Sequence, residues 1–505
     1  MTTRYLTTSI PYVNAEPHLG FALEIVEADT LARHARLRGD DVRFLTGTDD
    51  NALKNVAAAA AAGVETADFV AANAERFAGL RESLELSYDD FIRTGSDPRH
   101  APGVRKLWQR CAENGDFYQR RYTGLYCAGC EQFYVDAELV DGRCPEHGTG
   151  PDVVEETNWF FRLSRYQDRI IDLIESDVVR VNPAQRRNEV LAFLRSGLAD
   201  VSVSRPALRS GGWGIPVPND PSQVIYVWWE ALGNYVSALG YGTDDAAYRD
   251  WWVNSDERIH LLGKGVIRFH AVYWLAQLLS AGEPLPTAIL VHDYLTLNGA
   301  KISKSSRNTV DPGELAGHFG ADSVRWWLLR DVAKVGETDF TAARLVDRVN
   351  ADLANGLGNL VNRTLGIVHK YRAGRVSETS SGPFAEAVGR LPASIDDALA
   401  DADFRTATAA IGAAVEEGNR LIETVRPWEL FRAEQSGDAA AATRLDGLLA
   451  ELVAGCRELA REIGPFVPAF AARLGIQLGA GDRVGPPEPA FPRLELPAAE
   501  PILSR

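Results

Sequence analysis

The chain has 505 residues, enough for roughly three domains of usual size. Its composition, 46% apolar and 24% charged residues, is ordinary for a water-soluble protein, and no apolar run approaches the roughly 20 residues of a membrane helix. The 53 basic and 69 acidic residues give a net charge of −16, which argues against loose, non-specific nucleic-acid binding but allows a local basic face.

The chain begins with a predicted strand at residues 5–10, followed by a turn-rich segment and a helix from about residue 19 to 39. A second strand at residues 42–46 precedes an alanine-rich helix that starts near Ala52. Alternation of strands and helices at this spacing predicts a doubly wound, parallel α/β sheet. The first residues run directly into a strand and carry no signal-peptide segment, so we expect a cytoplasmic protein.

The strand–helix alternation stops near Tyr122. Up to about Asn219 the chain carries short strand-like segments, a cysteine cluster and turns rich in glycine and proline, which predicts a domain inserted into the sheet domain. Strand-like segments return at residues 224–229, 259–263 and 288–292. We therefore expect the sheet domain to occupy residues 1–120 and 223–310, with the inserted domain at 121–222.

The last third of the chain is helical in pattern. Apolar residues recur at three- and four-residue spacing between about residues 346 and 474, which is typical of amphipathic helices. We expect a linker region at 311–345, a helical domain at 346–478 and an extended tail at 479–505.

The cysteine cluster predicts a metal site. Two pairs with two-residue gaps, Cys127/Cys130 and Cys144/His147, have the spacing of a tetrahedral zinc knuckle. Four protein ligands leave no open position, so the predicted site is structural. Asp141-Gly142 between the pairs is typical of a hairpin turn. The competing interpretation is three buried thiols and a chance histidine.

Two further segments favour phosphate. The first places His18 and Gly20 where a strand gives way to a helix N-terminus, whose N–H groups attract anions. The second is a loop rich in glycine and serine that carries Lys301 and Lys304, two of only seven lysines in the chain. Two ammonium groups on one loop suit a pyrophosphate leaving group. A histidine cap and a solvated loop are the alternative interpretations.

These two segments together resemble the signature motifs of class I aminoacyl-tRNA synthetases, and their surroundings resemble the methionyl-tRNA synthetase family. Further matching motifs occur in the same order along essentially the whole chain: residues 10–14, 45–49, 226–228, 263–264, 268–270 and 427–428. The zinc knuckle also falls where that family carries one.

The resemblance implies a class I Rossmann-like catalytic sheet, an inserted connective domain with the zinc knuckle, a stem-contact linker and an all-α bundle of the anticodon-binding type. It implies that the carboxylate of an amino acid, methionine, attacks the α-phosphate of ATP, and that the resulting aminoacyl-adenylate is transferred to tRNA. ATP and Mg²⁺ would be bound, and Zn²⁺ would be structural. The sequence ends without the additional dimerisation domain of some family members, which predicts a monomer.

The resemblance also assigns roles to individual residues. His18, Lys301 and Lys304 match the residues that stabilise charge on the phosphates, and Asp49 matches the carboxylate that pairs with the substrate ammonium. The other positions that match nucleotide contacts are Gly20, Gly263, Lys264 and Ser303. The positions that match the methionine side-chain pocket are Ile10, Tyr12, Trp228, Tyr235 and His270, and those that match the anticodon readers are Asn359, Arg363 and Trp428.

Several positions depart from the family pattern. Phe21 replaces the second histidine of the first signature, and Gly265 replaces a carboxylate expected at the nucleotide ribose. The family's Thr-Asp-Glu-His-Gly is here Thr-Asp-Asp-Asn-Ala at residues 48–52, and Glu230 stands where an aspartate is usual. Losing one transition-state donor typically costs about 10²–10³ in rate, so Asp50, Asn51 or Glu230 would have to compensate.

Two hypotheses follow. The first is a methionine–tRNA ligase. The second is a diverged paralogue that forms the adenylate but transfers the acyl group to a small-molecule hydroxyl or amine, such as an N-hydroxylated amine in a hydrazine-type natural-product pathway. A catalytically inactive binding protein is a third interpretation, against which the intact lysine loop and Asp49 argue. The sequence leaves the identity of the amino acid and of the acceptor open.

Overall fold

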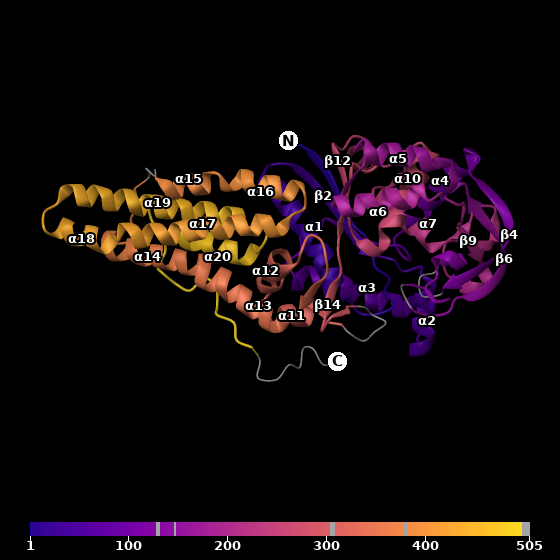
Figure 1. Cartoon of the computed structure of the whole chain (residues 1–505), viewed down its shortest axis with the longest axis horizontal. Helices are drawn as coiled ribbons and strands as arrows, with labels where there is room; N and C mark the ends of the chain where they lie inside the picture. Colours follow the sequence, from indigo (N-terminus) through magenta and orange to yellow (C-terminus); the bar gives the residue numbers. More distant parts are fainter. Residues whose placement is uncertain (128–131, 146–147, 303–308, 378–381, 497–505) are drawn as a thin grey trace. The chain divides into compact units, whose positions relative to one another are not determined.

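The computed structural model describes residues 1–127, 132–145, 148–302, 309–377 and 382–496 (Figure 1). The chain divides into two compact units. The first comprises residues 1–17, 38–81 and 87–292, and the second comprises residues 18–37, 82–86 and 293–505. No helix among the described residues combines the length and the apolar character that a bilayer crossing requires.

The first unit is built on a six-stranded parallel sheet in the order β3-β2-β1-β12-β13-β7. Every neighbouring pair is parallel, which confirms the predicted α/β sheet. The sheet order reverses between β1 and β12, and in sheets of this kind ligands bind outside the carboxyl ends of the strands at such a reversal. The strands are β1 (Thr3–Thr8), β2 (Asp41–Thr48), β3 (Asp90–Arg93), β7 (Arg180–Asn182), β12 (Glu257–Gly263) and β13 (Ala288–His292).

Nine α-helices among the described residues, of 3 to 18 residues, and two π-helical turns also belong to this part of the chain. Strand β13 is apolar and its first four residues are all buried, as expected for a parallel strand covered on both faces. The helices of this part of the chain are α2 (Leu53–Ala62), α3 (Thr66–Ser83, whose last residues belong to the second unit), α4 (His100–Glu113), α5 (Gln167–Glu175), α6 (Ala184–Arg195), α7 (Val227–Ala231), α8 (Asn234–Ser237), α9 (Ala246–Tyr248) and α10 (Leu275–Ala281).

Two small antiparallel sheets lie between β3 and β12 in the sequence. One has the order β5-β4-β6-β8 and the other β10-β11-β9. Between these strands the chain also forms β7, which is an edge strand of the main sheet. The antiparallel strands are β4 (Phe117–Cys127), β5 (Gln132–Tyr134), β6 (Asp152–Phe161), β8 (Val201–Ser202), β9 (Ser204–Pro206), β10 (Pro216–Val217) and β11 (Asp220–Ile225).

Two local sequence predictions in this region have different outcomes. Asp141 and Gly142 form the expected tight turn, because both have left-handed φ angles, 51° and 72°, and Val140 and Arg143 exchange backbone hydrogen bonds across them. The prediction of a strand over residues 224–229 is wrong beyond Ile225. The strand ends there and α7 begins at Val227, since a short apolar run does not by itself distinguish a strand from a helix.

The second unit is mainly helical, as predicted for its C-terminal part, and contains one small sheet. In that sheet β14 (Leu295–Leu297) pairs with β15 (Ala300–Lys301) and with β16 (Thr338–Phe340). Its C-terminal helices run alongside one another (Figure 1). The helices are α1 (Leu19–Leu37), α11 (Pro312–Phe319), α12 (Ala321–Asp331), α13 (Ala342–Val349), α14 (Asn359–Arg372), α15 (Pro383–Gly389), α16 (Leu391–Ala400), α17 (Phe404–Val425), α18 (Pro427–Gln435), α19 (Ala439–Ile463) and α20 (Pro468–Leu478).

A buried ion pair joins α1 and α12 within the second unit. Arg325 lies 2.7 Å from Asp29, and neither side chain is exposed. The same guanidinium donates to the carbonyls of Pro465 and Phe466, so one charged group also connects α12 to the end of α19. A buried guanidinium requires such a set of acceptors, because an unpaired buried charge is strongly destabilising.

Candidate functional site

Asp49 lies directly after β2, at the carboxyl edge of the parallel sheet. Its backbone N–H donates to the carbonyl of Pro11 (2.9 Å), and the residue forms a parallel bridge with Tyr12. Its carboxylate accepts from the N–H of Asn51 (3.1 Å) and the hydroxyl of Thr94 (3.4 Å). Because Asp49 is only 1% exposed, these contacts hold its carboxylate in a fixed position beside the ends of β1 and β2.

Asp50 points to a different set of partners. Its carboxylate accepts from Arg93 (3.2 Å) and from the hydroxyl of Thr48 (2.9 Å). Burial raises the pKa of Asp50, and the arginine and the threonine hydroxyl partly oppose that rise. The indole of Trp213 donates to the Asp50 carbonyl (2.9 Å). The two adjacent aspartates therefore have distinct environments, and Asp50 is committed to an internal ion pair.

Aromatic rings from three chain segments form a wall next to Asp49. The rings of Tyr12 and Trp228 lie 5.8 Å apart at 56°. Trp228, in α7, stacks on Phe269 with ring centroids 3.9 Å apart and an angle of 3°. Phe269 lies in one of the motifs that resemble the synthetase family, but the motif alone gives it no role. Only the packing shows that it supports Trp228.

Tyr235 and His270 adjoin this wall and form a hydrogen-bonded pair. The tyrosine hydroxyl lies 2.7 Å from Nε2 of His270, and Nδ1 of the same ring lies 2.9 Å from the carbonyl of Val266. Burial lowers the pKa of His270 to about 4, so the ring is neutral near pH 7. A carbonyl can only accept, so Nδ1 carries the proton and Nε2 accepts from the tyrosine.

His260, in β12, packs against Tyr235 of this pair. This histidine was not identified from the sequence. Its ring centroid lies 4.2 Å from that of Tyr235. Its Nε2 accepts from the indole of Trp274 (3.0 Å), and Nδ1 lies 2.7 Å from the hydroxyl of Thr7. Burial holds the pKa of His260 well below its usual value. His270 and His260 are therefore both neutral near pH 7.

Three further predicted residues of the first unit lie at the same sheet edge. Ile10 follows β1, and the N–H of Ser9 donates to the carbonyl of Leu261 (3.1 Å), which holds the end of β1 against β12. Gly263 is the last residue of β12, and Lys264 opens a short 3₁₀ turn. Ile10, Gly263 and Lys264 therefore follow the two strands between which the sheet order reverses.

In the second unit, His18 immediately precedes α1. Its Nδ1 accepts from the N–H of Phe21 (3.3 Å), which satisfies one of the unpaired donors at the helix start and leaves the ring proton of a neutral histidine on Nε2. A Cβ at Gly20 would lie 3.1 Å from this ring, so glycine gives the ring room. The side chain of Phe21 is only 6% exposed.

The hairpin that leads into the lysine loop also belongs to the second unit. Asn298 and Gly299 form its turn with left-handed φ angles of 55° and 75°. The Asp339 carboxylate accepts from the N–H of Gly299 (2.9 Å) and the hydroxyl of Thr296 (2.8 Å). Lys301 is the last residue of β15, whereas Ser303 and Lys304 lie outside the described residues. Val310, after the loop, accepts from the N–H of Leu19 (3.0 Å), which joins this segment to the start of α1.

Two of the four predicted zinc ligands can be placed. Cys127 ends β4, Cys144 follows the Asp141-Gly142 turn, and both are buried in one small cluster with Tyr134. The thiol of Cys144 lies 3.6 Å from the Tyr134 hydroxyl. Cys130 and His147 lie outside the described residues, and within the described ranges no group of three metal-binding side chains occurs.

The three residues predicted to read an anticodon lie on α14 and α18. Asn359 and Arg363 are one turn apart on α14, and Arg363 donates to Asn419 of α17 (2.9 Å). Trp428, near the start of α18, is 42% exposed. The stacked rings of Tyr371 and Phe431, 4.3 Å apart, hold α14 against α18.

Comparisons with known proteins agree on one group. A family model described as class I tRNA synthetases (M) matches residues 4–152 and 146–365. The methionine–tRNA ligase of Brucella suis is 38% identical over 97% of this chain and 97% of the relative. That of Mycobacterium tuberculosis H37Rv is 39% identical over 98% of this chain and 99% of the relative.

Solved structures give the same result. The structure of Mycobacterium tuberculosis methionyl-tRNA synthetase in complex with methionyl-adenylate has a TM-score of 0.88 and 39% identity, and covers 98% of this chain and 100% of that one. The free form of the same enzyme has a TM-score of 0.85 and 35% identity, with 98% and 99% covered.

Proposed function

The chain belongs to the family of class I tRNA synthetases of the methionyl type, and on that premise we propose that it is a methionine–tRNA ligase. It activates methionine with ATP as methionyl-adenylate and transfers the methionyl group to tRNA. The observation that supports this assignment best is the buried carboxylate of Asp49 beside an uncharged aromatic wall.

The chemistry of the substrate matches this arrangement. The methionine ammonium pairs with Asp49, a charge-assisted contact that orients the substrate carboxylate for attack on the α-phosphate. The thioether is soft and apolar and packs well against aromatic rings. Tyr12, Trp228, Tyr235 and His270 supply that surface, and Ile10 completes it from the end of β1. A neutral His270 suits this role, because an imidazolium would have to be desolvated beside an apolar side chain.

The nucleotide contacts are assigned residue by residue from the family motifs. Gly263 and Lys264 follow β12. His18 and Gly20 begin α1, where the helix terminus and an imidazole Nε2–H favour phosphate oxygens. Lys301, Ser303 and Lys304 belong to the lysine loop, whose ammonium groups stabilise the charge on the departing pyrophosphate. Mg²⁺ accompanies the ATP phosphates.

Two of the departures from the family pattern have a structural explanation. Phe21 stands at a position of the family's first signature motif, but its side chain is buried and serves in packing. Glu230 is buried and bonded to His100, so it does not act as a free carboxylate. Gly265 is exposed on the turn after β12, and no contact in the structure explains the substitution.

We also propose that Cys127, Cys130, Cys144 and His147 bind one structural zinc ion. The residues that can be placed fit this role: two thiols are buried together in a cluster too small to form a core of its own. A tight turn joins the two ligand pairs. Zinc would stabilise this small part of the chain.

Asn359, Arg363 and Trp428 are assigned to the tRNA anticodon. An exposed indole offers a stacking surface for a base, and Arg363 and Asn359 carry donors on one face of α14. Asn419 fixes the direction of the Arg363 side chain.

The test of the assignment has two stages. Methionine-dependent exchange of pyrophosphate into ATP measures the first step, and acid-precipitable radiolabelled methionine on purified tRNA measures the second. We expect both reactions. Exchange without charged tRNA would instead support transfer to a small-molecule amine or hydroxyl, and no exchange with any amino acid would exclude adenylate formation.

A further inference from the structure

A buried polar pair joins α4 to the segment that carries the aromatic wall. Nε2 of His100, the first residue of α4, lies 2.6 Å from Oε2 of Glu230 in α7, and the side chains are 0% and 1% exposed. Nδ1 of the same histidine lies 2.9 Å from the hydroxyl of Ser237 in α8. One imidazole therefore contacts two consecutive short helices, 130 and 137 residues away in the sequence.

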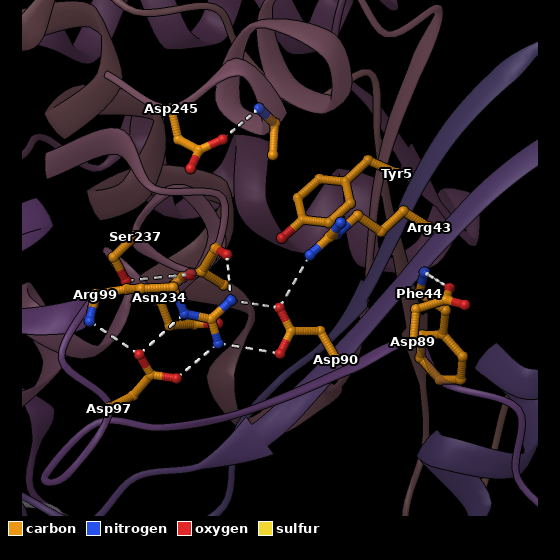
Figure 2. A network of polar contacts seen from close by, with 12 residues as sticks. Tyr5, Arg43, Phe44, Asp89, Asp90, Asp97, Arg99, Asn234, Ser237 and Asp245 are labelled. Atoms are coloured by element: carbon orange, nitrogen blue, oxygen red, sulfur yellow. Dashed lines mark hydrogen bonds and ion pairs between the residues drawn. The ribbon is translucent and has the colours of Figure 1, made fainter. Parts of the chain in front are cut away.

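The residue before this histidine, Arg99, lies at the centre of a polar network (Figure 2). Its guanidinium bonds to both carboxylate oxygens of Asp97 and of Asp90, and donates to the carbonyl of Ala238 (2.7 Å). Burial alone would raise the pKa of Asp97, but the hydrogen bonds from Arg99 hold that pKa below its usual value. Asp90 belongs to β3, so the start of α4 is tied to the central sheet.

The backbones of α4 and α8 also pack closely. A Cβ placed on Gly103 of α4 would lie 2.6 Å from the Cβ of Ser237. A Cβ on Gly242, just after α8, would lie 2.6 Å from the backbone nitrogen of Gly103. Real side chains do not come so close, so glycine is required at both positions for α8 to approach α4 this far.

The segment held in this way carries two residues of the proposed pocket. Trp228 is two residues before Glu230, and Tyr235 is two residues before Ser237. Helices of five and four residues have little stability of their own, so their position depends on tertiary contacts. A small displacement of α7 or α8 would move the Trp228 ring on Phe269 and the Tyr235 hydroxyl on His270.

We infer that His100 and Glu230 form a positioning pair that sets the shape of the methionine pocket through α7 and α8. This inference rests on the proposed function. The second carboxylate oxygen of Glu230 has no hydrogen-bond partner among the described residues, so His100 is its main support. Removing the histidine leaves a buried carboxylate that must move towards a new partner, and α7 moves with it.

The test compares the KM values for methionine and for ATP in pyrophosphate exchange. His100→Ala and Glu230→Ala should each raise the KM for methionine about 10-fold or more and change the KM for ATP less than about twofold, because the pair acts on the side-chain pocket. Glu230→Gln should restore the KM to within about threefold, since its amide oxygen can still accept from the imidazole. Ser237→Ala, which removes one hydroxyl, should give a smaller rise in the same direction.

The matched control lies at the other end of the same helix. Asp116 follows α4, is fully buried, and accepts from Ser280 (2.7 Å) and Asn114 (2.8 Å). The 14 residues of α4 separate the two ends by about 21 Å. Asp116→Ala should lower the melting temperature and leave the KM for methionine unchanged.

The inference is overturned if the KM for methionine stays unchanged in His100→Ala and Glu230→Ala while their melting temperatures fall as much as that of Asp116→Ala. That result would show that the pair is only structural. If the alanine variants do not fold, an unchanged KM in Ser237→Ala overturns it equally. Failure of the proposed function is distinguishable, because it would abolish methionine-dependent exchange in the unaltered protein.

Discussion

The hydroxyl of Tyr235 donates to Nε2 of His270 across 2.7 Å, and the opposite ring nitrogen of that histidine donates to the carbonyl of Val266. In this arrangement the neutral imidazole accepts the tyrosine proton. Protonation of Nε2 would end that arrangement, because the hydroxyl would have to turn and accept from the ring instead. The contact depends on burial, which lowers the pKa of the ring to about 4.

This pair predicts a pH dependence of stability. The folded pKa of His270 lies below the usual value of 6.5, so the unfolded chain takes up the proton first as the pH falls. The stabilising contribution is complete above pH 6.5 and is lost as the pH falls towards 4. At pH 5 the expected loss is about 2 kcal/mol relative to pH 7.5. Urea unfolding at several pH values measures it, and His270→Gln should show a correspondingly shallower dependence. Identical slopes in both proteins would contradict the assignment.

Asp49→Asn should weaken amino-acid activation selectively. The substitution keeps the shape of the side chain and removes the charge that pairs with the substrate ammonium, a contact worth about 1.5–3 kcal/mol. We expect kcat/KM for methionine in pyrophosphate exchange to fall by about 10- to 100-fold. Asp40→Asn is the control, because Asp40 pairs with Arg4 at the start of the sheet. A near-normal rate in Asp49→Asn would show that the amine is held elsewhere.

Zinc content tests the proposed knuckle. Metal analysis of the purified protein should give one zinc per chain, and Cys127→Ser or Cys144→Ser should lower both the zinc content and the melting temperature. Cys456→Ser is a matched control, because Cys456 is equally buried but lies in α19 near Thr364. A zinc-free preparation with unchanged melting would refute the structural role.

Trp428→Ala should separate the two steps of the reaction. Its exposed ring offers stacking worth about 1–3 kcal/mol per base, so the KM for tRNA in aminoacylation should rise about 5- to 100-fold. Methionine-dependent exchange requires no anticodon contact and should be unaffected. Phe431→Leu is the control for a general loss of aromatic packing on α18. It should lower the stability of the protein rather than raise the KM for tRNA.

Phe21→His restores the family residue and should not improve catalysis. The Phe21 side chain is buried, so an imidazole there would lose apolar packing and enter an environment unsuited to a polar ring. We expect a loss of about 3 kcal/mol in the free energy of unfolding. Chemical denaturation together with single-turnover adenylate formation measures both quantities. A faster adenylate step at unchanged stability would show that the ring reaches the nucleotide.

Much of the central sheet could be predicted because its strands are encoded locally. The mainly apolar runs at residues 259–263 and 288–292 form largely buried strands, and neither run has the spacing of an amphipathic helix. Asp141-Gly142 was predictable for a similar reason, since these residues tolerate left-handed φ angles. The end of β11 at Ile225 was not, because valine and tryptophan at residues 227–229 fit a buried helix as well as a strand.

The site was predictable only in part, and the reason is sequence distance. Asp49, Trp228 and His270 lie in recognisable motifs, whereas the supports behind them are single residues in unrelated segments. His100 and Glu230 are 130 residues apart, and nothing local indicates their contact. Phe269 and His260 likewise acquire their roles only when η7 (Phe269–Trp274) and β12 reach the aromatic wall.

The flat stack of Trp228 on Phe269 and the neutral His270 together have a consequence for fidelity. Lysine or glutamate would have to give up hydration of its charged group against these rings, and the hydration that is not recovered disfavours both by several kcal/mol. An unbranched aliphatic chain of the same length has no such barrier, because replacing sulfur with a methylene changes little in an apolar contact. Near-cognate errors should therefore come from straight-chain analogues of methionine, against which a pocket of this kind discriminates only weakly.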